Sequence, residues 1–105
     1  MIKIGNTLII NGDISYEENI NLIDMYTITY GLSNRSTVTA SSIDQNSFTY
    51  CLQRKIYTIY GEEILPQEFN VFFRKEPNDI YPYLEFITLL LLCGNDVNIF
   101  KDILF

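Results

Sequence analysis

The sequence predicts a single α+β domain over residues 1–105, an antiparallel β-sheet with helices packed on one face. Two observations predict this class. Apolar and polar residues alternate in several short segments, which is typical of strands with one buried face. The segment 80–93 is instead almost wholly apolar and of helical length. Expected elements follow the order strand, helix, several strands and helices, which is typical of α+β domains, and 105 residues with 48% hydrophobic content are enough for one core.

The N-terminal part of the chain is expected to form a hairpin followed by a short helix. Residues 2–4 and 7–10 are strand-like and flank a Gly-Asn dipeptide, which tolerates the positive φ of a two-residue turn. Ser15 followed three residues later by Glu18 is a capping-box pattern, and apolar residues recur at helical spacing after it. We therefore expect a short acidic helix at about 15–24.

The middle of the chain is expected to consist mainly of strands. Residues 26–32 and 37–43 lie on either side of a turn-forming segment and predict an antiparallel hairpin. Residues 48–60 fit either a helix or a strand, and their Thr and Tyr content favours a strand. After a loop at 61–68, alternation over 69–73 predicts a further strand.

Two helices are expected at the C-terminal end. Asp79 can cap a helix over 80–93, and Gly94 suits the left-handed conformation that ends a helix. Asp96 can cap a final helix that follows. The first of these helices is too short to cross a bilayer, which takes roughly 20 residues.

The helix expected at 80–93 has few polar side chains, chiefly Glu85 and Thr88. A helix of this composition must be covered nearly all round. We therefore expect either that the sheet and the last helix wrap it, with Leu90 in the core, or that it forms a self-association surface.

Several kinds of chemistry have no support in the sequence. The chain has no histidine, which removes Ser-His-Asp and Cys-His catalysis and the commonest nitrogen ligand of metal sites. No glycine-rich phosphate-binding motif occurs. Cys51 and Cys93 lack the spacing of a metal site or a disulfide framework, and we interpret them as reduced, packed thiols. No catalytic, cofactor-binding or metal-binding residue is expected.

Negative charge is concentrated in two parts of the sequence. The chain has 13 acidic and 7 basic residues, and its four lysines are few for a composition otherwise typical of an A+T-rich gene. Two stretches without basic residues supply the candidate partner-binding residues: Asp13, Tyr16, Glu17, Glu18 and Asp24 in the first acidic zone, and Tyr57, Tyr60, Glu62, Glu63 and Glu68 in and beside the second. They fit an acidic surface with aromatic anchors for a basic protein, or a solvated face that keeps the domain soluble.

Direct binding to nucleic acid or to a membrane is not expected. Phosphate contacts need clustered Lys and Arg residues, which this chain lacks. The N-terminal residues do not contain a basic region followed by a long apolar stretch, so we expect no secretory signal and a cytoplasmic location.

These observations favour a small, non-catalytic protein that binds and blocks a basic protein partner. The leading hypothesis is an inhibitor or immunity protein from an A+T-rich bacterial or phage element, with a toxin nuclease as its partner. The alternatives are a phage-encoded antagonist of a host defence effector, whether anti-CRISPR-like or a nucleic-acid mimic, and a structural or assembly subunit that uses the helix at 80–93. A small enzyme based on Asp or Glu is the weakest hypothesis.

Overall fold

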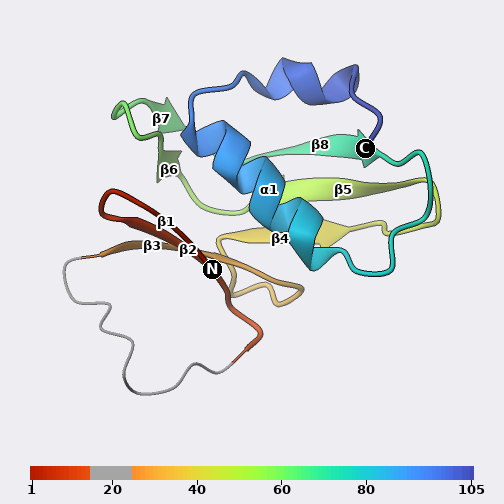
Figure 1. Cartoon of the computed structure of the whole chain (residues 1–105), viewed down its shortest axis with the longest axis horizontal. Coiled ribbons are helices and arrows are strands. Elements are labelled where there is room, and N and C mark those ends of the chain that lie inside the picture. The colour runs from red at the N-terminus through yellow and green to blue at the C-terminus, as the bar shows by residue number, and fades with distance from the viewer. Residues whose placement is uncertain (15–24) are drawn as a thin grey trace.

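The computed structural model describes residues 1–14 and 25–105, which form a six-stranded sheet, a separate two-stranded hairpin and two helices (Figure 1). In spatial order the sheet consists of β1 (Ile2–Ile4), β2 (Thr7–Asn11), β3 (Tyr26–Tyr30), β4 (Val38–Ser41), β5 (Ser47–Leu52) and β8 (Gln67–Phe72). The remaining elements are the hairpin of β6 (Ile56–Tyr57) and β7 (Glu63–Ile64), the helix α1 (Tyr81–Leu92) and the 3-10 helix η1 (Val97–Lys101). This is the α+β class that the sequence predicts.

The sheet is mixed, so the prediction of an antiparallel sheet is wrong for β3. β1–β2, β4–β5 and β5–β8 pair antiparallel, but β3 runs parallel to both β2 and β4. Residues 12–25 join β2 to β3 and are long enough for a crossover, which takes about a dozen residues. The β3–β4 ladder has one pair of partners, Tyr30 and Val38. The chain leaves the end of β3 and continues in the same direction in the neighbouring strand β4, so the antiparallel hairpin expected there does not form. Alternation predicts which side chains face the core, but it is the same for both pairing directions.

The other predicted strands are confirmed. β1 and β2 form the expected hairpin, with Gly5 at a φ of +56° in its turn. β5 and β6 resolve the ambiguity over 48–60 in favour of strands. β8 overlaps the strand expected at 69–73, whereas the loop expected at 61–68 contains β7. The helix expected at 15–24 lies outside the described residues.

η1 begins at its predicted capping residue, whereas α1 begins one residue later than expected, with Ile80 rather than Asp79 as its N-cap. Asp79 Oδ1 accepts a 3.0 Å hydrogen bond from the N–H of Tyr81, the first residue of α1. Gly94 follows the last turn of α1 with a φ of +91°, a conformation that favours glycine. Asp96 Oδ1 accepts a 2.8 Å bond from the N–H of Asn98 and caps η1. Local signals therefore fix where the helices begin and end.

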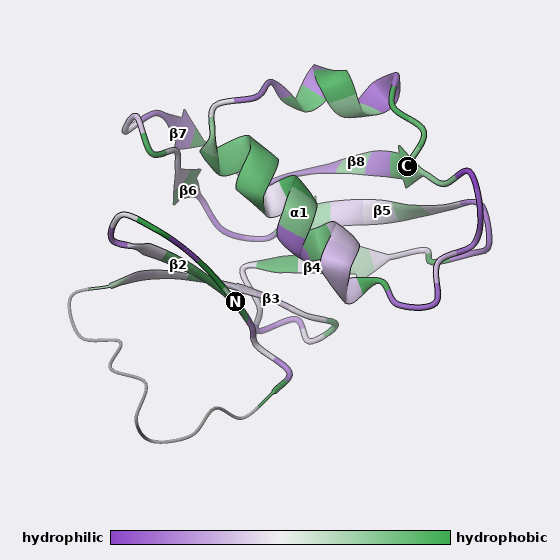
Figure 2. Ribbon diagram, in the orientation of Figure 1, coloured by the Kyte–Doolittle hydropathy of each residue, from purple (hydrophilic) through white to green (hydrophobic). Residues whose placement is uncertain are grey.

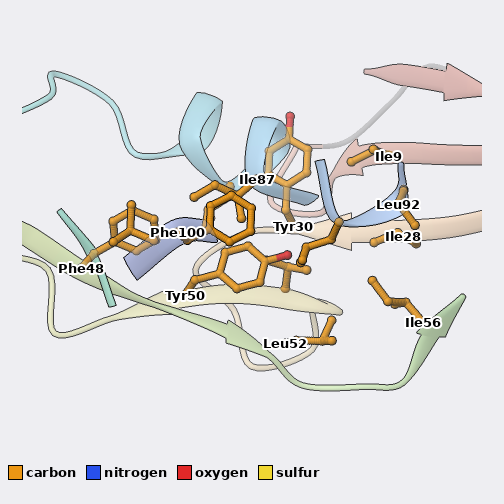
Figure 3. Packing of buried hydrophobic residues seen from close by; sticks show 14 of the residues in the cluster. Ile9, Ile28, Tyr30, Phe48, Tyr50, Leu52, Ile56, Ile87, Leu92 and Phe100 are labelled. Carbon is orange, nitrogen blue, oxygen red and sulfur yellow. The ribbon is translucent and has the colours of Figure 1, made fainter. Parts of the chain in front are cut away.

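One hydrophobic cluster joins α1, η1 and the main sheet. Figure 3 shows Tyr50, Ile87 and Phe100, from β5, α1 and η1, meeting within this cluster. The ring of Phe69 stacks between two of the aromatic residues, at centroid distances of 4.8 Å from Tyr50 and 5.2 Å from Phe100. The cluster therefore connects elements that are far apart in the sequence.

The helix α1 is mainly hydrophobic (Figure 2), but it is not covered all round. Leu91 is fully buried, Leu90 is only partly buried, and Phe86 is 49% exposed. Thr88 is fully buried, and its Oγ1 lies 2.8 Å from the hydroxyl of Tyr50. Within residues 1–14 and 25–105, no helix has the length and hydrophobicity needed to cross a bilayer.

Candidate functional site

The second acidic zone contains the β6–β7 hairpin, which lies beside the C-terminal end of α1 (Figure 1). Thr58 organises the turn of this hairpin. Its N–H donates to the carbonyl of Glu62 at 2.8 Å, and its Oγ1 accepts two backbone N–H groups of the turn, at 3.2 and 3.1 Å. Gly61 has a φ of +81°, which other residues adopt only with strain. The N–H of Ile59 donates to the carbonyl of Leu92 at 2.9 Å, and this bond attaches the hairpin to the last turn of α1.

The hairpin presents two tyrosines and two glutamates to solvent. Tyr57 is 42% exposed and Tyr60 is 69% exposed, and Glu62 and Glu63 are also exposed. Tyr57 and Glu63 are cross-strand partners. In Figure 2 the hydrophilic β7 lies next to the hydrophobic end of α1. We call these four residues the hairpin surface; they are four of the five residues predicted in and beside the second acidic zone.

A cavity of about 200 Å³ lies between the hairpin and the turn that joins α1 to η1. We call this cavity the hairpin pocket. Three of its lining residues carry carboxylates: Glu62, Glu63 and Asp96. Tyr60 does not line the cavity itself, but its ring lies close to the lining residue Gly94, where a Cβ would be 3.2 Å from the ring. The pocket therefore combines negative charge with an adjacent aromatic ring.

The charges around the pocket are predominantly negative. Lys55 is a nearby cation, and its Nζ lies 5.6 Å from the centroid of the Tyr57 ring. Its hydrogen bond with Tyr57 and the charge of Glu63 raise the pKa of Lys55 above its usual value, so it stays charged. No basic residue lies in the last turn of α1. Within the described chain, no group of three or more His, Cys, Asp or Glu side chains is placed to hold a metal ion.

Asp13 of the first acidic zone is bonded within the domain. Its Oδ2 accepts hydrogen bonds from the N–H of Leu32 at 2.7 Å and from the hydroxyl of Tyr81 at 2.8 Å. These bonds, chiefly the one from Leu32, lower the pKa of Asp13 below its ordinary value of 3.8. The carboxylate also lies against Gly31, where a Cβ would be 2.6 Å from one of its oxygens. Asp13 thus ties the residues after β2 and β3 to the start of α1, and its role in partner binding stays a prediction.

The remaining predicted residues do not join the hairpin surface. Glu68 is exposed on β8, and its neighbour Phe69 packs on the core, so Glu68 points to the opposite face of the sheet. The rest of the first acidic zone lies outside the described residues: Tyr16, Glu17, Glu18 and Asp24.

Two residues that sequence reasoning did not select lie beside the hairpin surface. Tyr26 is 38% exposed, and its ring centroid is 6.5 Å from that of Tyr57. Asp96 lines the hairpin pocket with Glu62 and Glu63. Tyr26 has the pattern of an ordinary strand residue and Asp96 that of a helix cap, so no local signal could identify either.

The two cysteines differ in environment. Both are free thiols; Cys51 is buried, and its Sγ lies 3.6 Å from the carbonyl of Thr49, whereas Cys93 is exposed. The interpretation of both as packed thiols is therefore correct for Cys51 and wrong for Cys93.

The hairpin surface and the hairpin pocket together form the candidate functional site. Exposed aromatic rings, carboxylates and a cavity suit non-covalent binding of a positively charged surface. In comparisons with known proteins, no family model, curated protein or solved structure matches the chain.

Proposed function

We propose that this chain is a small, acidic, non-catalytic protein of the cytoplasm that binds and blocks a basic protein partner, as an inhibitor or immunity protein blocks a toxin nuclease. One observation carries the proposal. Tyr57, Tyr60, Glu62 and Glu63 lie exposed on one hairpin, next to an acid-lined cavity.

Tyrosines and carboxylates have different tasks in an interface of this kind. Tyrosine brings a large contact area at a low cost in side-chain entropy, so it anchors a complex and slows its dissociation. Carboxylates attract a positive surface over a distance and speed association, an effect that salt screens. The net charge of −6 adds to this attraction over the whole chain.

The proposed binding mode leaves the core of the domain unchanged. In it, α1 and η1 cover one face of the main sheet, and the hairpin at the C-terminal end of α1 meets the partner. The bond between Ile59 and Leu92 holds the hairpin on the helix, so the hairpin surface is preorganised for binding.

A comparison of two charge reversals of equal size tests the proposal. Glu62→Lys with Glu63→Lys alters the hairpin surface. Glu76→Lys with Asp102→Lys is the matched control, since each pair raises the net charge from −6 by the same amount. Glu76 precedes α1, whose 12 residues span about 18 Å, so it lies towards the other end of the helix from the hairpin. The partner is captured from cells that carry the gene, identified, purified and used for binding kinetics at low and high salt.

We expect the hairpin pair to slow association by about tenfold or more at low salt and to flatten its salt dependence, with a much smaller effect of the control pair. Tyr60→Ala should instead speed dissociation. Cooperative thermal unfolding of each variant excludes a folding defect. A partner that is not basic would contradict the proposal, as would equal losses from the two charge-reversed pairs, which would show that only net charge matters.

The identity of the partner separates the inhibitor from its nearest alternative. A nuclease that is encoded beside this chain and loses activity on binding indicates an immunity protein. A host defence effector that loses activity indicates a phage antagonist with the same binding surface.

A separate apolar groove favours assembly as a second candidate function. It measures about 220 Å³ and is lined by Pro82, Tyr83, Phe86 and Phe105. An assembly subunit would use this groove for self-association, so Phe86→Ser should lower the particle mass measured by light scattering. If the unmodified chain keeps the mass of a monomer even at high concentration, self-association through this groove is excluded.

A further inference from the structure

We infer that the hairpin pocket binds one arginine side chain of the basic partner. This inference rests on the proposed function, because it names the group that the candidate site recognises. The size of the cavity, the source of its carboxylates and the adjacent aromatic ring each point to this ligand.

The size of the hairpin pocket suits one side chain. Pockets for small molecules and cofactors usually measure about 300–1,000 Å³. At about 200 Å³, this pocket is smaller than that range but larger than the roughly 30 Å³ that one water molecule occupies in the liquid. A single long side chain that enters from a partner's surface fits between these limits.

The charge of the lining suits a cation. Glu62 and Glu63 come from the hairpin and Asp96 from the start of η1, so the carboxylates belong to different elements that border one cavity. Lys55, which lies over the ring of Tyr57, does not line the cavity.

The arrangement favours a guanidinium over a metal ion or an ammonium. The carboxylates do not form a group that could hold a metal ion within the described residues. Arginine presents five donors in a planar fork and can bond to acceptors on more than one side, whereas lysine is a compact point charge. A guanidinium also stacks on aromatic rings, and the ring of Tyr60 lies close to Gly94, one of the residues that line the pocket.

The inference can be tested without the natural partner by titrating the protein with a short peptide and recording the NMR signals of its backbone amides. The probe is N-acetyl-Gly-Arg-Gly-amide. The same peptide with citrulline keeps the shape of arginine but removes its charge, and the peptide with lysine keeps the charge but removes the fork. We expect the arginine peptide to cause saturable shifts at Gly94, Asn95 and Val97, with a dissociation constant on the order of 1 mM, because few atoms are in contact.

Two double variants identify the residues that bind the peptide. Glu62→Gln with Asp96→Asn removes two charges of the pocket, and the asparagine keeps the capping ability of Asp96. The matched control, Glu76→Gln with Asp79→Asn, makes the same two chemical changes at the beginning of α1. We expect the pocket variant to weaken peptide binding at least about tenfold and the control to leave it within about twofold.

Each outcome decides the inference. The inference is supported if the arginine peptide binds saturably and this binding is lost both with the pocket variant and with the citrulline peptide. The inference is overturned if the arginine peptide does not saturate, or if the citrulline or lysine peptide binds equally well. It is also overturned if the pocket variant binds the arginine peptide with unchanged affinity. If the peptide fails while Glu62→Lys with Glu63→Lys still slows association with the partner, the hairpin surface remains the binding site and only the arginine pocket is wrong. If both tests fail, the proposed function is wrong as well.

Discussion

The hydrogen bond between Tyr50 and Thr88 joins β5 to α1 inside the core, and we expect its two hydroxyl groups to contribute unequally to stability. Both side chains are fully buried, and their hydroxyl oxygens are 2.8 Å apart. The single hydroxyl proton of Thr88 is donated to the carbonyl of Leu84 at 2.7 Å. The hydroxyl of Tyr50 must therefore be the donor to Thr88 Oγ1. Loss of the Thr88 hydroxyl therefore leaves the Tyr50 donor without an acceptor, whereas loss of the Tyr50 hydroxyl leaves the Thr88 donor bonded to Leu84.

Thr88→Val removes the acceptor without a large change in volume. It leaves the Tyr50 hydroxyl buried and without a partner, which should cost about 1–3 kcal/mol in the free energy of unfolding. Tyr50→Phe removes the donor while Thr88 keeps its bond to Leu84, and should cost about 0.5–1.5 kcal/mol. In the double variant no donor is stranded, so adding Tyr50→Phe to Thr88→Val should not lower stability further.

This double-mutant cycle is measured by urea unfolding of the unmodified chain, the two single variants and the double variant, with circular dichroism as the signal at neutral pH. Each kcal/mol lost should lower the thermal midpoint by roughly 4–8 °C in a domain of about this size. Two results would refute the reasoning: a loss below about 0.5 kcal/mol for Thr88→Val, or additive losses in the double variant.

The same buried hydroxyl makes stability depend on alkaline pH. Burial raises the pKa of Tyr50 far above its ordinary value of 10.0. The unfolded chain therefore loses this proton first, so the stabilisation is fully present below about pH 10 and declines as pH rises further towards the folded-state pKa. Tyr50→Phe should make the fall in the urea midpoint above pH 10 shallower than in the unmodified chain.

Three further predictions concern the core and the Asp13 contact. Leu91→Ala should cost about 2–5 kcal/mol, as expected for a fully buried leucine, and Leu90→Ala less because its side chain is only partly buried; urea unfolding of both checks the order. The pKa of Asp13 is lowered by folding, so its contribution is present above pH 3.8 and is lost as pH falls through the folded-state pKa. Asp13→Asn should therefore reduce the fall in the urea midpoint on acidification from about pH 5 to about pH 3. Gly31→Ala should displace the Asp13 carboxylate, so its loss of stability in urea should be less than additive with that of Asp13→Ala.

The sequence by itself determined the class of the fold, the position of most elements and much of the candidate site. Gly94 predicts the end of α1 correctly, and Asp79 lies next to its N-cap, Ile80, because the signals at helix ends depend on residues only a few positions away. Alternation over 48–52 and 69–73 predicts strands for the same reason, since each residue's face follows from its neighbours. The tyrosines and glutamates of the hairpin surface could be selected because they lie within one short, acidic stretch.

Only the tertiary structure decided how these elements meet. The parallel direction of β3 depends on the path of the connecting chain, which periodicity does not encode. Burial of Thr88 follows from the presence of a Tyr50 hydroxyl across the core, so a polar residue on an apolar helix could not be assigned from its own segment. Asp96 and Glu62 line the same cavity because the hairpin is bonded to the end of α1, which places residues that are distant in sequence around it. These features depend on long-range contacts, whose cost in chain entropy is offset only when the whole core forms.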